Sequence, residues 1–519
     1  MNAIELELFK HRFAAIADEM GGILRRAAAS PNIKERRDFS CAVFDARGEM
    51  IAQAAHIPVH LGAMPLSVAA AVRKFGHDLR PGDAVMLNDP FEGGTHLPDI
   101  TLVSPVFTAD GEQLGFVASR AHHADVGGMA PGSMPVAREI YQEGLILPPV
   151  RIQQAGKLVS GILDILLANV RTPDERRGDL LAQLAANRRG VQRLEELAAE
   201  HGASTLAQAA EALLAYTERM TRSLLADLPD GEYTFADALD DDGSIEGRVP
   251  LRVTVTIAGE SATVDFSGSA LQRAGSVNAV YAITLSAVYY VFRCLIGLDV
   301  PNNAGCLRPI RVIAPHGTVL NARKPAPVAG GNVETSQRIV DVLLGALAQA
   351  CPQRVPAASQ GTMNNVTIGG HTPEGAPFAY YETIGGGGGA RPTADGVSGR
   401  HSHMTNTLNT PAEALEYAYP LRVLRYEMRQ DTGGAGRYRG GDGLRRDVQV
   451  LVPCRVTLLS ERRVTRPYGL HGGQSGACGE NILLRGEKEI PLPGKGTFEM
   501  RAGDVLSVRT PGGGGWGDA

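Results

Sequence analysis

A predicted β-hairpin places the strongest constraint on how the first third of this chain can fold. Two β-rich runs, residues 100–108 and 113–120, flank Asp110-Gly111. An Asp-Gly pair between two such runs is typical of a two-residue hairpin turn. In that register, Ala109 pairs with Glu112, and every later pair along the two strands is determined.

The same register brings polar side chains to one rim of the hairpin. Asp99 lies opposite His122, and His96 lies just before the first strand, so three potential metal ligands converge. Side chains alternate between the two faces of a strand, so His123 should point to the other face. Pro105 fits only an edge strand or a bulge, and a one-residue slip would exchange the two histidines. The pattern therefore favours His122 over His123 and leaves that exchange open.

Composition narrows the class of protein. A chain of 519 residues is too long for one ordinary core, which favours roughly two to four domains or subdomains. A net charge of −5 argues against a nucleic-acid or anionic-membrane partner, because both call for a basic surface. Six cysteines without a CxxC pair favour reduced thiols over disulfides. The first residues lack the apolar core of a signal peptide, so we expect a cytoplasmic protein.

One apolar segment resembles a membrane span. Residues 276–292 carry no charge, but a spanning helix needs about 20 mostly apolar residues. This segment is shorter, and it contains three tyrosines, an asparagine, a threonine and two serines. We expect a buried core helix rather than a membrane helix.

The order of predicted elements indicates an α+β (mixed α/β) protein of several domains. Residues 1–230 combine the hairpin with two long helices that form a helical hairpin, as an N-terminal metal-site α/β domain. Residues 231–325 alternate strands with the core helix, as a central α/β domain. Residues 326–519 form a β-rich C-terminal domain with glycine runs at 385–389, 433–443 and 512–517.

The hairpin rim carries the side chains best suited to chemistry. Residues 96–99 and 122–125 supply imidazole and carboxylate groups, which suit Zn²⁺, Mn²⁺ or Fe²⁺. No thiolate accompanies them, so an open catalytic site is favoured over a structural zinc site. The alternative is that these are hydrogen-bonding loop residues. Four more side chains are candidates to complete the site or build a second one, although each alone is more typical of a structural loop: Asp38, His56, His60 and Asp89.

Motifs for nucleotide binding and serine catalysis are missing from the sequence. It contains no Walker motif, no dinucleotide fingerprint and no GxSxG elbow. The glycine runs are more typical of tight turns and close backbone packing than of phosphate binding. We therefore predict no cofactor-binding residues for ATP in this chain.

A series of polar and glycine-containing blocks extends over nearly the whole chain, at residues 37–42, 56–62, 88–90, 94–99, 121–128, 330–337, 403–407, 434–441 and 510–517. In this order the blocks resemble the hydantoinase B family. That family provides the smaller subunit of ATP-dependent hydantoinases and oxoprolinases, and it is related to the metal-bearing subunit of acetone and acetophenone carboxylases.

The resemblance implies a division of labour within a hetero-oligomer. A larger, hydantoinase A-like subunit with an actin-like fold spends ATP to phosphorylate a lactam, imide or enolate oxygen, and this chain handles the activated species. In the hydantoinase branch, metal-activated water attacks the carbon of an imidyl phosphate derived from a small cyclic amide, and phosphate leaves. The chain length of 519 residues favours this branch over the longer acetone carboxylase subunit.

Carried over residue by residue, the resemblance implies metal positions at His96, Asp99 and His122. It implies that Asp38 is a further ligand or an active-site carboxylate. It also implies supporting catalytic roles beside the metal for Asp89, His123 and Asp125.

The expected metal is Zn²⁺ or Mn²⁺, with Fe²⁺ as an alternative, and ATP is expected on the partner. Two other functions stay open. The first is a subunit of an ATP-dependent ketone carboxylase, in which an activated enolate attacks CO₂ near the metal. The second is a structural partner whose metal only holds the hairpin.

Overall fold

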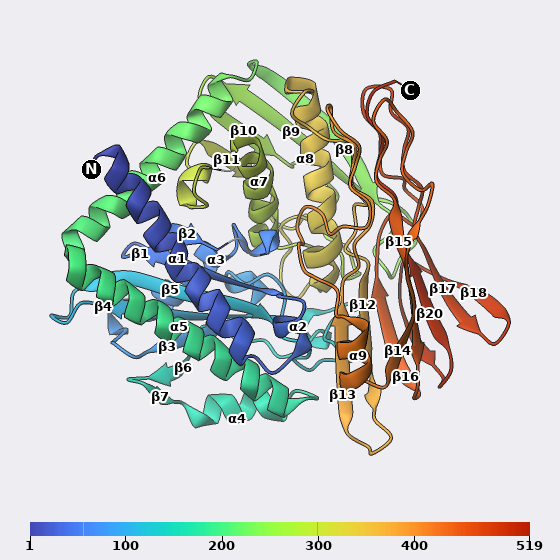
Figure 1. The fold of residues 1–519 in the computed structure, drawn as a ribbon, viewed down its shortest axis with the longest axis horizontal. Coiled ribbons are helices and arrows are strands. Elements are labelled where there is room, and N and C mark those ends of the chain that lie inside the picture. Colours follow the sequence, from blue (N-terminus) through green and yellow to red (C-terminus); the bar gives the residue numbers. More distant parts are fainter. Residues whose placement is uncertain (55–56, 298, 519) are drawn as a thin grey trace.

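An antiparallel seven-stranded sheet forms the N-terminal part of the computed structural model, which describes residues 1–54, 57–297 and 299–518 (Figure 1). The strand order is β2-β1-β5-β4-β3-β6-β7. The strands are β1 (Phe39–Asp45), β2 (Met50–Gln53), β3 (Ala84–Leu87), β4 (Asp99–Phe107), β5 (Gln113–His122), β6 (Val150–Gln154) and β7 (Lys157–Leu158). The fold is the mixed α+β arrangement of several regions that the sequence predicts.

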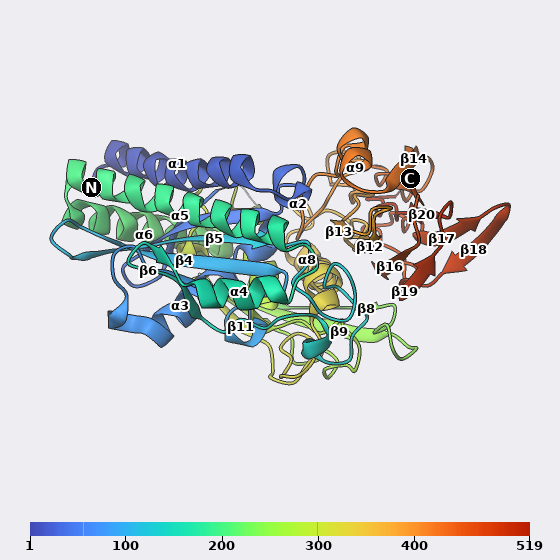
Figure 2. The same ribbon diagram turned by 90° about the horizontal axis from the view of Figure 1, so that it is seen from below.

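Helices cover both faces of this sheet. On one face, α1 (Ala3–Ala27) and the helical hairpin α5 (Pro173–His201) and α6 (Ala203–Ala226) pack against alternate residues of the strands, such as Cys41 and Val43 (Figure 2). On the other face, α3 (Met64–Phe75) packs against the residues between them, such as Ala42 and Phe44. Two short helices, α2 (Pro31–Lys34) and α4 (Ser160–Ala168), lie near the edges. The predicted helical hairpin is confirmed.

The turn between β4 and β5 differs from the predicted two-residue turn. Thr108 N donates to Glu112 O at 2.8 Å, and Gly111 N donates to Thr108 O at 3.0 Å, so the loop has three residues, with Gly111 at φ +85°. A longer loop shifts the pairing by one residue, and Phe107 accordingly pairs with Gln113. A bulge between Val106 and Phe107 restores the predicted register beyond it. The prediction was therefore wrong at the turn and right at the rim.

The central part contains a second sheet of order β11-β10-β9-β8. Strands β8 (Gly231–Leu239), β9 (Val249–Ala258) and β10 (Ser261–Asp265) are antiparallel, and β11 (Ile310–Ile313) runs parallel to β10. Helices α7 (Tyr281–Ile296) and α8 (Ser336–Ala350) pack against each other, and α8 covers β8 and β9. Residues along α7 are buried, as predicted. Among the described residues, no helix is both long enough and apolar enough to cross a membrane.

Two further sheets form the C-terminal part (Figure 1). One has the order β13-β12-β16-β19, with β12 (Asn365–His371), β13 (Pro377–Glu382), β16 (Cys454–Leu459) and β19 (Lys495–Met500). The other has the order β14-β15-β20-β17-β18, with β14 (Leu421–Arg429), β15 (Gly443–Val450), β17 (Glu480–Arg485), β18 (Lys488–Leu492) and β20 (Val505–Arg509). Both sheets and α9 (Ala412–Ala418) contribute to one hydrophobic cluster.

The glycine runs pack backbone against backbone in a structure that we call the glycine lattice, formed by residues 385–390, 433–441, 469–476 and 511–517. Gly441 N donates to Gly388 O at 2.8 Å, and Gly513 N donates to Gly441 O at 2.9 Å. A Cβ atom on Gly440 would lie 2.0 Å from Gly513 O. Because these amides already donate to backbone carbonyls, close packing is the confirmed role of the runs.

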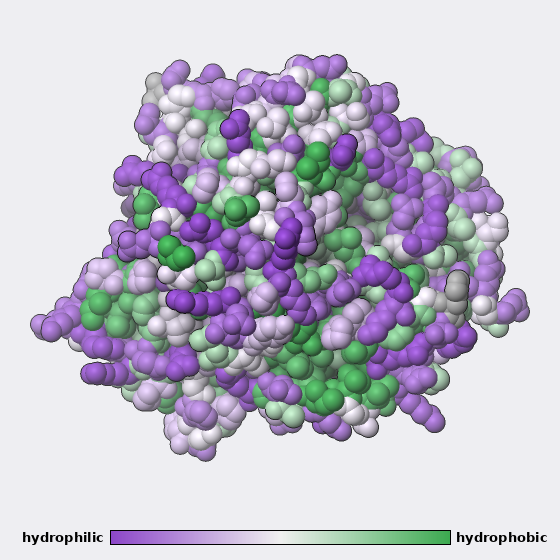
Figure 3. Space-filling model, turned by 180° about the vertical axis from the view of Figure 1, so that it is seen from behind, coloured by the Kyte–Doolittle hydropathy of each residue, from purple (hydrophilic) through white to green (hydrophobic). Residues whose placement is uncertain are grey.

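Apolar contacts are continuous between the regions. One hydrophobic cluster includes residues from Ala42 to Leu459 and crosses both predicted boundaries, at residues 230 and 325. The division into 1–230, 231–325 and 326–519 therefore stays a prediction. Seen from behind the view of Figure 1, the surface has hydrophobic residues gathered in its lower part, between hydrophilic ones (Figure 3).

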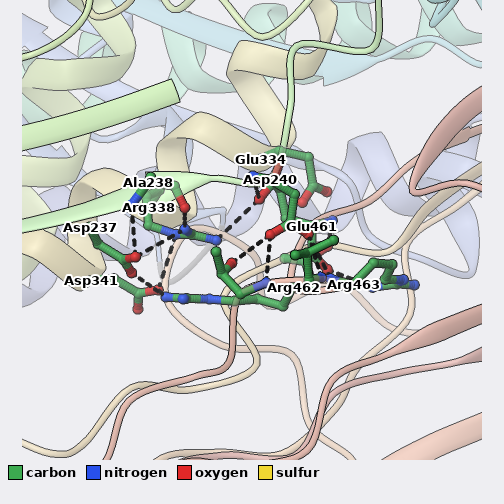
Figure 4. A network of polar contacts seen from close by, with 12 residues as sticks. Asp237, Ala238, Asp240, Glu334, Arg338, Asp341, Glu461, Arg462 and Arg463 are labelled. Carbon is green, nitrogen blue, oxygen red and sulfur yellow. Dashed lines mark hydrogen bonds and ion pairs between the residues drawn. The ribbon is translucent and has the colours of Figure 1, made fainter. Parts of the chain in front are cut away.

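A buried ionic network around Arg338 joins the central and C-terminal parts (Figure 4). Arg338 of α8 lies 3.5 Å from Asp237 and 3.2 Å from Glu461. Arg462 lies 2.7 Å from Asp237 and 2.5 Å from Asp341, and Lys495 lies 2.5 Å from Glu461. Each charge thus has an opposite charge within 4 Å, which offsets the cost of removing it from water.

Candidate active site

The ends of three strands build the predicted rim. Strands β4 and β5 pair Asp99 with His122, as the sequence predicts, and His96 lies in the turn before β4. On the other side of β5, His122 N donates to Asp38 O at 3.0 Å, just before β1 begins. The structure therefore brings His96, Asp99, His122 and Asp38 together, and all four are buried.

The strand alternation separates the two neighbouring histidines, as predicted. His123 Nε2 lies 3.0 Å from Gln183 Oε1 of α5, on the face of the sheet that α1 and α5 cover. Burial lowers the pKa of His123 to about 4. His122 is thus the histidine of the rim.

Each of the three predicted metal ligands has one polar atom held by a neighbour and one bare atom, meaning a buried atom without a hydrogen-bond partner. For His96, Nε2 lies 3.3 Å from Asp99 Oδ2 and 3.2 Å from the Asn332 amide nitrogen, and Nδ1 is bare. For Asp99, Oδ2 accepts a 2.6 Å hydrogen bond from Thr95 Oγ1, and Oδ1 is bare. For His122, Nδ1 lies 3.2 Å from the Asn32 amide nitrogen, and Nε2 is bare.

Electrostatics distinguish the two carboxylates of the site. Burial raises the pKa of Asp99, but the neighbouring His96 and His60 outweigh it and hold that pKa well below its usual value. Burial raises the pKa of Asp38 to about 7, against the opposing effect of Arg36 at 3.9 Å and with the help of the Asp99 charge. Asp99 is therefore a permanent acceptor, whereas Asp38 can exchange a proton near neutral pH.

A divalent metal fits the donor types of this cluster, since two imidazoles and a carboxylate offer bare atoms in one buried place. The ring centroids of His96 and His122 lie 5.0 Å apart. As the side chains stand, no group of three or more His, Cys, Asp or Glu among the described residues is arranged to hold a metal ion. The donor types and the bare atoms of the cluster thus fit a metal.

Two predicted site residues have their contacts in neighbouring loops. Asp89 Oδ1 accepts from Phe91 N at 3.0 Å, and its Oδ2 lies 3.4 Å from Lys324 Nζ. Asp125 accepts hydrogen bonds from backbone amides of its own loop and lies 2.9 Å from Arg171 NH1. Both carboxylates hold loops beside the rim, and their predicted catalytic roles stay predictions.

The two further candidate histidines differ in what the structure shows. His60 Nε2 lies 3.5 Å from Asp99 Oδ2, and its Nδ1 lies 2.8 Å from Ser40 Oγ. His60 therefore connects Asp99 to Ser40 of β1. His56 lies outside the described residues.

Other parts of the chain complete the walls of the site. Tyr381 of β13 stacks on His122 at 4.1 Å between ring centroids, and the Arg36 guanidinium lies 4.6 Å from the centre of the Tyr381 ring. Asn32 and Asn332 contact the rim histidines. Sequence reasoning missed these walls because they depend on contacts between residues far apart in the chain, 90 residues for Asn32 and 236 for Asn332. Only Asn332, directly after Gly330-Gly331 in the block at residues 330–337, carried a local signal.

Comparisons with known proteins agree with this architecture. The profile of the family described as hydantoinase B/oxoprolinase matches residues 2–519. An uncharacterized protein of Methanocaldococcus jannaschii is 44% identical over 100% of this chain and 91% of its own length. The 5-oxoprolinase 1 of Arabidopsis thaliana is 42% identical over 99% of this chain, which spans only 42% of that longer protein.

Two solved structures share the fold. The ATP-dependent caprolactamase from Pseudomonas jessenii has a TM-score of 0.93 and 28% identity, with 100% of this chain and 91% of that chain covered. An acetone carboxylase has a TM-score of 0.89 and 20% identity, with 100% of this chain and 76% of that chain covered, and shows likeness of fold alone.

Proposed function

Because the chain belongs to the hydantoinase B/oxoprolinase family, we propose that it carries the hydrolytic site of an ATP-dependent cyclic amide hydrolase. The observation that carries this proposal is the rim of His96, Asp99 and His122, where three bare polar atoms lie buried. Buried polar atoms without partners cost about 1–3 kcal/mol each, so a cluster of them is typical of a binding site.

ATP is used by a larger partner in this proposal. Support comes from the sequence, which has no Walker motif, and from the glycine lattice, many of whose amides donate to backbone carbonyls. The longer 5-oxoprolinase 1 has more than half of its length outside the part that this chain spans, which leaves room there for another activity.

A divalent metal, Zn²⁺ or Mn²⁺ with Fe²⁺ as an alternative, would be held by His96, Asp99 and His122. Such an ion supplies Lewis-acid polarisation and lowers the pKa of water. Asp38, buried beside the rim with a pKa near 7, would hold and release a proton at its carboxylate. Arg36 and Tyr381 close the site against water.

Phosphorylation explains why ATP is needed at all. An unstrained amide is a poor electrophile, and a phosphoryl group on its oxygen makes the carbon reactive towards water. Ring opening then requires that water adds to this carbon and that the C–N bond breaks with a proton delivered to nitrogen. The resulting acyl phosphate releases phosphate to a second water, so two waters and one ATP are consumed for each ring.

The runner-up is a subunit of an ATP-dependent ketone carboxylase, supported only by the fold it shares with acetone carboxylase. The third possibility is a structural partner. One experiment separates the hydrolase from the carboxylase: the chain is co-purified with its larger partner, its metal content is determined, and ATP consumption is measured with hydantoins, lactams and ketones in labelled bicarbonate. We expect ring-opened product without label, and label in the product would overturn the hydrolase proposal.

The variant His96→Ala tests the role of the rim in the same preparation. We expect loss of turnover by at least about a thousandfold, or roughly 4 kcal/mol, with intact folding and assembly. Loss of folding or assembly instead would support the structural alternative.

A further inference from the structure

The turn that leads into α8 packs tightly against residues 276–278 and residues 140–143. Its π-helix, η6 (Gly331–Thr335), packs so tightly that a Cβ atom on Gly331 would lie 1.8 Å from Asn278 O. Gly331 N donates to Ser276 O at 3.0 Å, and Thr335 Oγ1 donates to Val277 O at 2.5 Å. Single π-turns of this kind often occur at functional sites.

A buried carboxyl group holds the other side of the same turn. Glu143 Oε1 accepts hydrogen bonds from Val328 N and Ala329 N, both at 2.9 Å. Ile140 N donates to Pro325 O at 2.9 Å just before them. The turn is thus fixed from two sides, by residues 276–278 and by residues 140–143.

The fixed turn places the Asn332 side chain at the rim. Asn332 is 4% exposed, and its amide nitrogen lies 3.2 Å from His96 Nε2, a contact across 236 residues of sequence. For Nδ1 to bind a metal, Nε2 must carry the ring proton, and a half-turn of the Asn332 amide then presents its oxygen to Nε2 as the acceptor. Because Asp99 Oδ2 is the other group at Nε2, Asn332 and Asp99 together occupy that nitrogen and leave Nδ1 bare.

We propose that Asn332 is a positioning residue, which holds Nε2 of His96 and thereby leaves Nδ1 as the nitrogen available to bind a metal. An imidazole that binds a metal through one nitrogen needs its other nitrogen held, and loss of such support typically costs about 10–100-fold in metal affinity. The inference rests on the proposed function in that His96 is taken as a metal ligand. The rival explanation is that Asn332 only fills buried space.

Four variants of the full chain test this proposal. Asn332→Leu keeps the size and removes the hydrogen bond, and Asn332→Asp keeps an oxygen for His96 Nε2. His96→Ala removes the positioned ring. Asn187→Leu is the matched control, because Asn187 is also buried, also donates through its amide nitrogen and also has a bare Oδ1, but it lies on α5 against the other face of the sheet.

The first readout needs no metal. In crystal structures of the metal-free chain, we expect the His96 ring to turn in Asn332→Leu and to stay in place in Asn332→Asp and Asn187→Leu. An unmoved ring in Asn332→Leu would overturn the proposal.

The second readout is the dissociation constant for Zn²⁺ or Mn²⁺, measured by titration calorimetry. We expect Asn332→Leu to weaken binding about 10–100-fold, Asn332→Asp to match or exceed the wild type, and Asn187→Leu to have no effect. In a His96→Ala background, Asn332→Leu should have no further effect, because the pair is coupled. An equal loss in both backgrounds would overturn positioning, whereas absence of metal binding by the wild type would overturn the proposed metal and leave the first readout to decide the inference.

Discussion

Two buried polar clusters in this molecule differ in the side chains that form them and in how their charges are compensated. In the ionic network around Arg338, every charged group has an opposite charge within 4 Å, and the network joins β8, α8 and β19. At the rim around His96, each of three side chains has one atom held and one bare. Bare atoms also occur in the network, on Arg338, Asp341 and Arg462, so a bare buried atom does not by itself mark a functional site. The rim differs because its bare atoms belong to two imidazoles and a carboxylate, which are donor types that bind a metal.

The difference implies that the two clusters fail in different ways when they are altered. Loss of one cation in the network leaves its buried carboxylates with fewer cations than negative charges, which destabilises the fold. Loss of a side chain at the rim removes a proposed metal ligand and the contacts of its one held atom. Stability and metal binding should therefore respond to different substitutions.

The largest expected effect comes from the network. Arg338→Met removes the cation that contacts both Asp237 and Glu461, and we expect the chain to lose about 3–5 kcal/mol of unfolding free energy. Denaturant titration gives this loss, and metal affinity should change little. The control Arg455→Ala removes an exposed pair with Glu499 and should cost less than about 1 kcal/mol. Equal losses of unfolding free energy in Arg338→Met and Arg455→Ala would contradict a special role of the network in stability.

Metal addition tests the rim separately from the ionic network. A ligand that binds only the native state stabilises it by about 3 kcal/mol at roughly 100 times its dissociation constant. We expect Zn²⁺ or Mn²⁺ to raise the melting temperature of the wild type and of Arg338→Met, but not that of His96→Ala. A rise of the same size in His96→Ala would place the metal elsewhere.

A third prediction concerns Glu143, a buried carboxyl group outside both clusters. Burial raises its pKa to about 8, so the native state holds this proton more tightly than the unfolded state. Its contribution to stability is thus lost as pH rises from about 4.5 towards 8. Between pH 5 and pH 8, the wild type should lose on the order of 2–3 kcal/mol more than Glu143→Gln, which cannot ionise. Parallel pH profiles from chemical denaturation would refute this assignment.

The smallest expected effect is at the wall of the site. Tyr381→Leu removes the ring stacked on His122, and stacked aromatic pairs contribute about 0.5–1.5 kcal/mol. We expect metal affinity to fall roughly 3–10-fold in calorimetry. The neighbouring Tyr380 lies 5.1 Å from Tyr419 by ring centroids, in the C-terminal hydrophobic cluster, so Tyr380→Leu should leave the affinity unchanged. A loss in both variants would indicate general loosening of β13.

Local rules predicted the rim but not its walls. Alternation along a strand and a hairpin register placed Asp99 opposite His122, and the pairing held although the turn itself has three residues, because a bulge compensates for the extra one. The contacts of Asn32, Asn332 and Tyr381 with the rim depend on tertiary packing, which no periodicity reports. The glycine runs were interpreted as close packing, but their partners in the lattice lie too far along the chain to be deduced.

The glycine lattice has a consequence for biosynthesis. Its segment 511–517 exchanges hydrogen bonds with residues 358, 387, 441 and 474, so these bonds cannot form until that segment leaves the ribosome. The N-terminal sheet, in contrast, has all its strands within the first 158 residues. On a nascent chain, the rim histidines therefore leave the ribosome well before Asn332 and Tyr381, so the strands of the rim can pair while the walls of the proposed metal site are still missing.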